Sequence, residues 1–284
     1  MDLKKILKER RPNLSNSSIT TYNSILRNLH RKVFDKDLEE NDFHDTKAIT
    51  AYLLNIPANR RKTILSALTV LTGLQEYREA MMNDIETYTQ QIARQEKTET
   101  QQDNWLEPDV LQEKLEQHKK NASLLYRKKS LTEKDLQEIQ NYILLVLYSG
   151  VYVPPRRAKD YVDFRIGKEI DKDKENYLDK GAMIFNSYKT SKKYGQQKVP
   201  LPNAMKTILK KWIAVNPTPY LLFDTNQSPL TSVKLNQRLN KIFGKKISVN
   251  ALRHSYLSEK YGDIGDDLSN MGTSMNMVTT YVKK

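Results

Sequence analysis

Cysteine is absent from this chain of 284 residues, which excludes a disulfide framework, a thiolate nucleophile and a cysteine-bound metal. Histidine is scarce: the chain has four, and none has the spacing of a metal-binding pair, which argues against a zinc enzyme. The longest apolar run, YILLVLYSGVYV, is too short to cross a bilayer. The first fifteen residues contain no apolar core, so we expect no secretory signal and no membrane partner.

Positive charge is what the chain has in excess. Its 47 Lys and Arg residues outnumber its 34 Asp and Glu residues, which gives a formal net charge of +13. Residues 1–70 carry +5, residues 71–120 carry −5 and residues 121–284 carry +13, so an acidic segment separates two basic ones. A basic balance of this size favours a polyanionic partner, most often nucleic acid.

Three regions follow from the pattern along the chain. Residues 1–80 are predicted to form short helices, because apolar residues recur at helical spacing after a serine N-cap at Ser15, Ser17 or Ser18. Residues 81–130 are rich in Gln and Glu and poor in large apolar residues, which predicts an acidic linker with some helix. Residues 131–284 return to apolar periodicity and are predicted to form a second domain.

The second domain is predicted to be mostly helical with one small β element. Thr132 and Asp135 have the spacing of a capping box before an apolar run. The stretch KGAMIFNSYKTSKKYGQQKVPLP places apolar segments on both sides of a polar centre with Gly195, which predicts a β-hairpin. Helices are predicted over 201–215, 232–246 and 248–262, the last ended by Gly262. The expected fold class is therefore mainly α with a small antiparallel sheet (α+β).

Four short motifs in this half contain residues suited to phosphate chemistry, in the order Arg, Lys, Arg, Tyr. The first is RRAKDYVDF, with Arg156 and Arg157. The second is YKTSKKYGQQKVPLP, with Lys189. The third is NALRHSYL, with Arg253, and the last is MGTSMNMVTTY, with Tyr281.

In these motifs the chain resembles the tyrosine recombinases, the phage-integrase-like family. The family's first arginine motif reads Gly-Leu-Arg-x-x-Glu, which matches Arg157 and Asp160 here, with Arg156 as the alternative arginine. Its lysine lies in a hairpin that ends in Val-Pro-Leu, which points to Lys189. Its second arginine motif, His-x-Leu-Arg-His, matches NALRH, and its closing Gly-His-Ser with Thr-Thr-Tyr matches MGTSMNMVTTY. The likeness covers 130–284 well and the N-terminal part more loosely.

The resemblance implies a specific reaction. A tyrosine, here Tyr281, attacks a DNA phosphodiester and forms a covalent 3′-phosphotyrosine, with neither ATP nor metal nor another cofactor required. Arg157 and Arg253 would stabilise the charge of the phosphorane, because a guanidinium pairs bidentately with two oxygens and keeps its proton. Lys189 would protonate the leaving 5′-oxygen. Asp160 would support the arginines.

Two positions depart from the family pattern. Asn250 and Thr273 stand where the family has histidines. Both can donate a hydrogen bond to a phosphate, but neither titrates near neutral pH. His254 is a supporting candidate that does not obviously replace them. The departures keep open a protein that binds DNA without cutting it, and a type IB topoisomerase is the other alternative, since it uses the same Arg, Lys, Arg, Tyr chemistry.

Each of these residues also has a purely structural interpretation. The paired arginines could begin a solvated helix, and Arg253 could belong to an ion pair. The occurrence of all four motifs in the order Arg, Lys, Arg, Tyr favours the catalytic interpretation over the structural one. Further DNA contacts are expected from exposed cations on a helix start in the first domain and around the predicted hairpin: Arg60, Arg61, Lys62, Lys192, Lys193 and Lys198. The first group could equally be a solvated cationic turn.

The resemblance also implies an architecture and a setting. A helical core-binding domain (1–80) and a catalytic domain (131–284), joined by the 81–130 linker, would form a C-shaped clamp on double-stranded DNA. We expect a dimer or tetramer assembled on DNA, an intracellular location with DNA, and a role in site-specific recombination or integration. The asparagine-containing motif suggests an origin in a large DNA virus, a virophage or a related mobile element.

Overall fold

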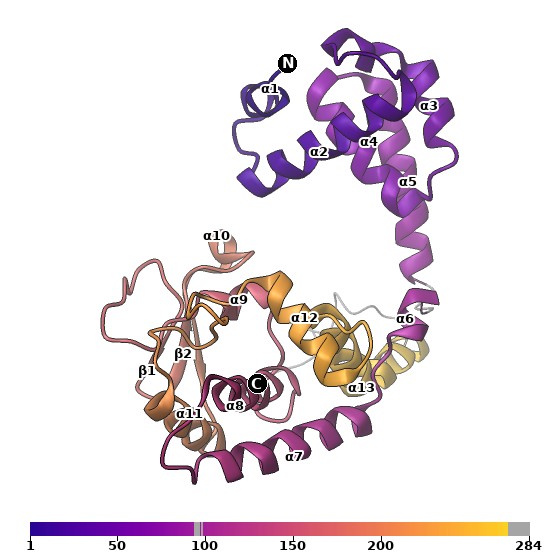
Figure 1. Ribbon diagram of the computed structural model, residues 1–284. Helices are drawn as coiled ribbons and strands as arrows, with labels where there is room; N and C mark the ends of the chain where they lie inside the picture. Colours follow the sequence, from indigo (N-terminus) through magenta and orange to yellow (C-terminus); the bar gives the residue numbers. More distant parts are fainter. Residues whose placement is uncertain (94–96, 98, 272–284) are drawn as a thin grey trace. The chain divides into compact units, whose positions relative to one another are not determined.

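The computed structural model describes residues 1–93, 97 and 99–271. The chain divides into two compact units, 1–97 and 98–284, each with its own hydrophobic core (Figure 1). Helices dominate, and a single three-stranded antiparallel sheet is present among the described residues, so the predicted fold class is confirmed. The functional boundaries proposed at 80 and 130 stay predictions. No helix in the described part of the chain combines the length and apolarity that crossing a membrane requires.

The first unit is a bundle of helices. Its elements are α1 (Leu3–Arg10), α2 (Asn16–Val33), the 3₁₀ helix η1 (Glu40–His44), α3 (Thr46–Leu53), α4 (Ala58–Thr72) and α5 (Gln75–Ala93). Of the three serines considered as the N-cap of α2, Ser15 fills the position, and its side chain accepts a hydrogen bond from the backbone of Ser18. The sequence pattern runs unbroken through 58–77, but Gly73 adopts φ +74° and separates α4 from α5. A glycine takes this left-handed conformation without the cost of a Cβ.

The second unit is built around one buried helix, α8 (Glu133–Tyr148). Every residue from Tyr142 to Tyr148 is buried, as expected of a helix that is covered on all sides. The predicted capping box of Thr132 and Asp135 begins this helix and is confirmed. Helices α7 (Pro108–Leu125), α11 (Asn203–Val215) and α13 (Val249–Asn270) pack on it (Figure 1). The unit also contains α6 (Glu99–Asp103), α9 (Ala158–Val162) and α12 (Ser232–Phe243).

The sheet consists of β1 (Tyr177–Asp179), β2 (Ala182–Phe185) and β3 (Gln197–Pro200), in the order β1-β2-β3. The predicted hairpin is the β2–β3 pair, in register from Ala182 opposite Pro200 to Phe185 opposite Gln197. The short helix α10 (Ser191–Tyr194) lies in the connection between them. Strand β1 was not predicted from the sequence. Lys180 and Gly181 form its two-residue turn with β2, and both have positive φ.

The predicted end of the last helix at Gly262 is wrong. Helix α13 continues through this glycine to Asn270. A glycine inside a helix costs only about 1 kcal/mol relative to alanine, which the remaining backbone hydrogen bonds of a 22-residue helix can offset.

A polar network joins α7 to α8. The carboxylate of Glu138 accepts hydrogen bonds from His118 at 2.8 Å, from Asn121 at 2.9 Å and from Asn141 at 3.1 Å. The hydrogen bond from His118 is the main reason why the pKa of the Glu138 carboxyl falls from 4.5 to about 2. The carboxylate therefore stabilises the folded unit as long as it is ionised.

Replacing Glu138 with alanine should lower the free energy of unfolding at pH 7 by about 2–3 kcal/mol, because three donors lose a charged acceptor. The pKa of Glu138 is lower in the folded state than in the unfolded state, so its carboxylate contributes its full stabilisation of the fold above about pH 4.5. This contribution is lost as the pH falls toward 2. The difference between wild type and variant should therefore shrink at pH 3. Urea unfolding followed by circular dichroism measures it, with Glu113→Ala on an exposed position of α7 as control. An equal difference at both pH values would contradict the interpretation.

Candidate active site

One pocket of the second unit gathers most of the arginine candidates. Its volume is about 550 Å³. It lies among the loop that follows α8 (residues 149–157, here called the arginine loop), α9, the β2–β3 connection, β3 and α13. The lining residues are Val153, Pro154, Pro155, Arg156, Arg157, Asp160, Tyr161, Tyr188, Thr190, Tyr194, Gln197, Val199 and Arg253. Residues nearly 100 positions apart thus meet at one site.

Arg253 reaches the pocket from the first turns of α13. Its neighbour Leu252 is fully buried in the core, which fixes the face that the helix turns inward. The Nε atom of Arg253 donates a hydrogen bond of 3.3 Å to the carbonyl oxygen of Pro155. Burial lowers the pKa of the guanidinium, and the positive charge of Arg157 lowers it further. The two cations therefore lie close enough to repel one another.

Asp160 is the acidic group of the pocket, and its side chain is only 2% exposed. Its Oδ2 accepts a hydrogen bond from Arg156, and its Oδ1 has no hydrogen-bond partner within the described residues. Burial raises the pKa of this carboxyl, while Arg156, Arg157 and Arg253 oppose the shift. One carboxylate thus faces three guanidinium groups, and an anion entering the pocket would find net positive charge.

Arg156 is held by the protein itself. Its Nε donates to Asp160 and its Nη1 donates to Gln197, each at 2.9 Å. The guanidinium carbon also lies 3.9 Å from the ring centroid of Phe185, a cation–π contact. This arginine ties the arginine loop to both strands of the hairpin. Gln197 was not predicted from the sequence, since no motif marks a single glutamine 41 residues away.

Arg157 occupies a different position. It is the N-cap residue of α9, is half-buried and lines the pocket. Its side chain makes no hydrogen bond or ion pair with any residue in the described ranges. Of the two adjacent arginines, Arg157 therefore has the guanidinium that is available to a ligand.

The lysine candidates are not among the residues that line the pocket. Lys189 is exposed between Tyr188 and Thr190, which both line it. The hydroxyl of Tyr188 donates a hydrogen bond of 2.7 Å to the carbonyl of Gly195, which joins the two ends of the β2–β3 connection. Three further cations are exposed on α10 and β3, namely Lys192, Lys193 and Lys198.

The remaining candidates of this unit fall into two groups. Asn250 and His254 are exposed on α13 and are not part of the pocket lining. Asn250 precedes Arg253 by three residues and so lies on the same side of the helix, whereas His254 is turned by about 100°. Thr273 and Tyr281 lie outside the described residues.

In the first unit, only one of the three predicted cations is both exposed and unpaired among the described contacts. Arg60 is exposed. Arg61 forms an ion pair with the buried Asp84, with its Nε 2.7 Å from Oδ2. The Nζ of Lys62 lies 3.2 Å from the ring centroid of Tyr88. The structure thus uses Arg61 and Lys62 to join α4 to α5.

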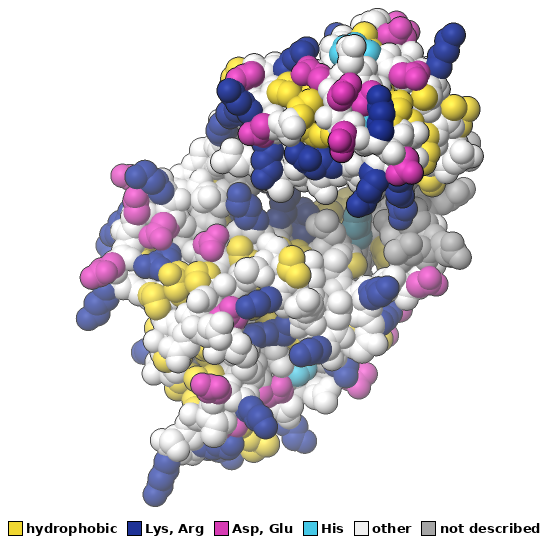
Figure 2. Space-filling view, turned by 45° about the horizontal axis from the view of Figure 1, so that its top comes forward, with side chains coloured by type: hydrophobic (Ala, Val, Ile, Leu, Met, Phe, Trp, Pro, Cys, Tyr) yellow, Lys and Arg dark blue, Asp and Glu magenta, His cyan; other side chains and the backbone are white. Residues whose placement is uncertain are grey.

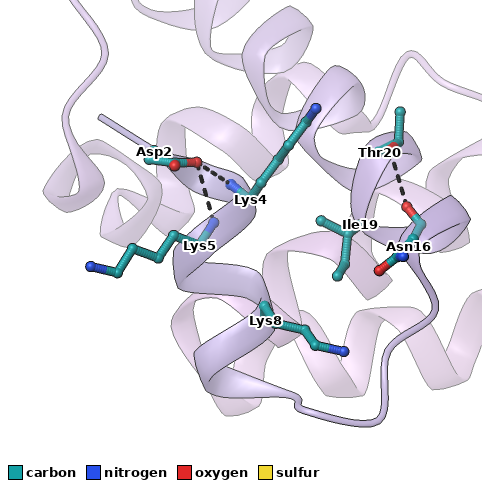
Figure 3. Close-up of a pocket in the computed structure, with 7 residues that line it drawn as sticks. All are labelled: Asp2, Lys4, Lys5, Lys8, Asn16, Ile19 and Thr20. Carbon is teal, nitrogen blue, oxygen red and sulfur yellow. Dashed lines mark hydrogen bonds between the residues drawn. The ribbon is translucent and has the colours of Figure 1, made fainter.

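The first unit has its own basic hollow between α1 and α2, which sequence reasoning missed. It is lined by Asp2, Lys4, Lys5, Lys8, Asn16, Ile19 and Thr20 (Figure 3). The carboxylate of Asp2 accepts hydrogen bonds from the backbone N–H groups of Lys4 and Lys5 and so caps α1.

Basic side chains are spread over the visible face of both units, with acidic ones among them (Figure 2). Within the described ranges, no three His, Asp or Glu side chains cluster as a metal site would require.

The fold of this chain is similar to that of a solved integrase. Among solved structures, a lambda integrase(75–356) dimer bound to a COC′ core site matches with a TM-score of 0.51 and 17% identity, over 99% of this chain and 95% of that one. XerA recombinase matches with a TM-score of 0.35 and 13% identity, over 91% and 83%. Comparison by sequence finds no matching family model and no matching curated protein. The predicted resemblance is confirmed by the fold.

Proposed function

We propose that this chain is a DNA recombinase or integrase that cuts and rejoins duplex DNA through a 3′-phosphotyrosine. The observation that carries the proposal is the convergence of Arg157, Arg253 and Asp160 on one pocket, within the fold of lambda integrase. Arg253 lies nearly 100 residues from the other two, and the three residues match two separate motifs of the family. DNA bound by that neighbour supports duplex DNA as the substrate here, and its dimeric state supports assembly of this chain on DNA. Such a substrate implies an intracellular location.

The reaction exchanges one phosphoester for another. The hydroxyl oxygen of Tyr281 attacks the phosphorus and forms the phosphotyrosine bond, while the bond from phosphorus to the 5′-oxygen breaks. The phenolic proton leaves to solvent or a nearby base, and Lys189 gives a proton to the departing 5′-oxygen. Rejoining reverses each transfer, so bond energy is conserved without ATP.

The arginines act on the charge that grows on the nonbridging oxygens. Two guanidiniums from α13 and the arginine loop can donate to a phosphate from different sides. Arg253 is already held in place before DNA arrives, because its neighbour Leu252 is buried in the core and its Nε donates to the Pro155 carbonyl. Preorganised donors stabilise a transition state more than donors that must first move. Asn250 and Thr273 would contribute neutral hydrogen bonds.

Replacing Arg156 with alanine should lower stability, whereas replacing Arg157 should lower the rate of strand cleavage. Arg156→Ala leaves the buried Asp160 without its partner, which should cost about 3–5 kcal/mol of stability. Arg157→Ala removes no contact of this kind, so its unfolding free energy should stay within about 1 kcal/mol of wild type. Its strand cleavage should nevertheless be about 10²-fold slower. Thermal unfolding and single-turnover cleavage measure the pair, and an unstable but fully active Arg157→Ala variant would reverse the assignment.

A nicked suicide duplex tests the proposed function. Cleavage next to the nick releases a short fragment, so the covalent protein–DNA complex accumulates and appears on a denaturing gel. Relaxation of a supercoiled plasmid without two-site recombination would indicate a type IB topoisomerase instead. Binding of duplexes without any covalent complex, including random duplex at low salt, would leave a DNA-binding protein that does not cut.

A further inference from the structure

A glycine of the arginine loop lies directly against an aromatic ring of α13. Gly150 has φ +78°, in the left-handed region. A Cβ added to it would lie 2.7 Å from Cε2 of Tyr256 and closer still to Cδ2, well inside van der Waals contact. Both the backbone conformation and the packing therefore require glycine here.

A second contact also joins the arginine loop to α13. It is the hydrogen bond from Arg253 to the carbonyl of Pro155. Tyr256 follows Arg253 by three residues and so shares its side of the helix. The loop thus meets this side of the helix at both Gly150 and Pro155. Pro155 is followed directly by the two arginines.

The helix that carries the ring is fixed to the core. Leu252 is fully buried, and the hydroxyl of Ser255 donates to the carbonyl of Leu106 at 2.5 Å. The loop is fixed at its start, because Ser149 caps α8 through a hydrogen bond from its N–H to Leu145. A wider group at position 150 would therefore push the loop and α13 apart, unless the ring of Tyr256 leaves its place.

We propose that the Gly150–Tyr256 contact is a positioning device that sets the separation of Arg157 and Arg253. The inference rests on the proposed function, since it assigns these residues to the phosphate grip of that site. Two guanidiniums that line one pocket repel each other until an anion binds, and the positive charge of Arg157 is one of the causes that lower the pKa of Arg253. Tight packing at Gly150 and the Pro155 carbonyl hold them together against this repulsion.

The test compares two glycines of similar backbone conformation. Gly244, which ends α12, has φ +69° and nothing within 4 Å of an added Cβ. Gly150→Ala and Gly244→Ala thus share the backbone strain, and only the first adds a clash. Single-turnover cleavage by Gly150→Ala should be about 10²-fold slower than wild type, since a displacement of about 1 Å can cost that much. Cleavage by Gly244→Ala should stay within about threefold, and duplex affinity should change little in either.

Removing the ring of Tyr256 should relieve part of the loss caused by the added Cβ. Tyr256→Ala, which has no clash, should be about tenfold slower than wild type, and Gly150→Ala/Tyr256→Ala should match it rather than fall further. If Gly150→Ala does not fold, Tyr256→Ala and the double variant still test the proposal. A crystal structure of Gly150→Ala, or of Tyr256→Ala in that event, should show the Arg157 and Arg253 guanidiniums displaced relative to each other.

Equal cleavage by the two glycine variants, or an unchanged separation of the arginines in the crystal, would overturn the positioning inference. A wild-type protein without any covalent complex would instead overturn the proposed function. In that case the crystal structures still decide whether the contact sets the separation.

Discussion

Strand cleavage by Arg253→Ala is expected to be about 10²–10³ times slower than by the wild type, the scale seen when one preorganised oxyanion donor is lost. Burial and the neighbouring Arg157 both lower the pKa of the Arg253 guanidinium, so its positive charge is less stable here than in water. A phosphate relieves this cost, and a phosphorane with an additional negative charge relieves it further. The effect should therefore fall on the chemical step.

The matched control for this loss of charge is Lys246→Ala. Lys246 is exposed in the turn before α13, so the variant removes one positive charge near the helix without touching the pocket. Its cleavage should stay within about threefold of wild type, and both variants should bind duplex DNA with affinities that differ by only several-fold. Arg253→Lys should recover part of the rate at most, because an ammonium cannot donate bidentately. If Arg253→Ala weakened binding but left the cleavage rate unchanged, Arg253 would be a DNA contact and not a catalytic residue.

Tyr281→Phe should abolish the covalent complex altogether, because a phenyl ring has no oxygen to attack phosphorus. Duplex affinity should remain within about twofold, since one neutral hydroxyl contributes little to binding that phosphate charge dominates. The sequence motif assigns the nucleophile to Tyr281, which lies outside the described residues, and an exposed tyrosine of the pocket is the alternative nucleophile. Tyr194 lines the pocket and is 58% exposed, whereas the hydroxyl of Tyr188 is bonded to Gly195.

Tyr194→Phe is therefore the informative control. The proposal predicts that this variant still forms the covalent complex at a rate close to wild type. Loss of the complex in Tyr194→Phe, with retention in Tyr281→Phe, would move the nucleophile to the hairpin connection.

Local signals in the sequence predicted much of the second unit. The capping box at Thr132 and the apolar segments on both sides of Gly195 depend on residues close together in sequence, and both elements formed as expected. Glycine was harder to interpret. Gly73 ends a helix because its φ is positive, whereas Gly262 lies inside one, and the residue type by itself does not distinguish the two cases.

The interactions that distinguish neighbouring cations could not be predicted, because they join distant segments. Arg61 pairs with a carboxylate 23 residues away, which makes it a link between α4 and α5. Arg156 donates a hydrogen bond to a glutamine 41 residues away, which leaves the guanidinium of Arg157 available to a ligand. The motif gave both arginines as candidates, and only the tertiary contacts separate them. The role of each remains a prediction until the variants are measured.

The covalent bond between protein and DNA is the most direct test of the proposed chemistry. The complex formed with a nicked suicide duplex would be digested with protease and nuclease, and the nucleotide-bearing peptide sequenced by mass spectrometry. We predict a single adduct, a nucleotide joined through its 3′-phosphate to the hydroxyl of Tyr281. An adduct on any other residue, or a 5′-phosphate linkage, would contradict the proposed reaction.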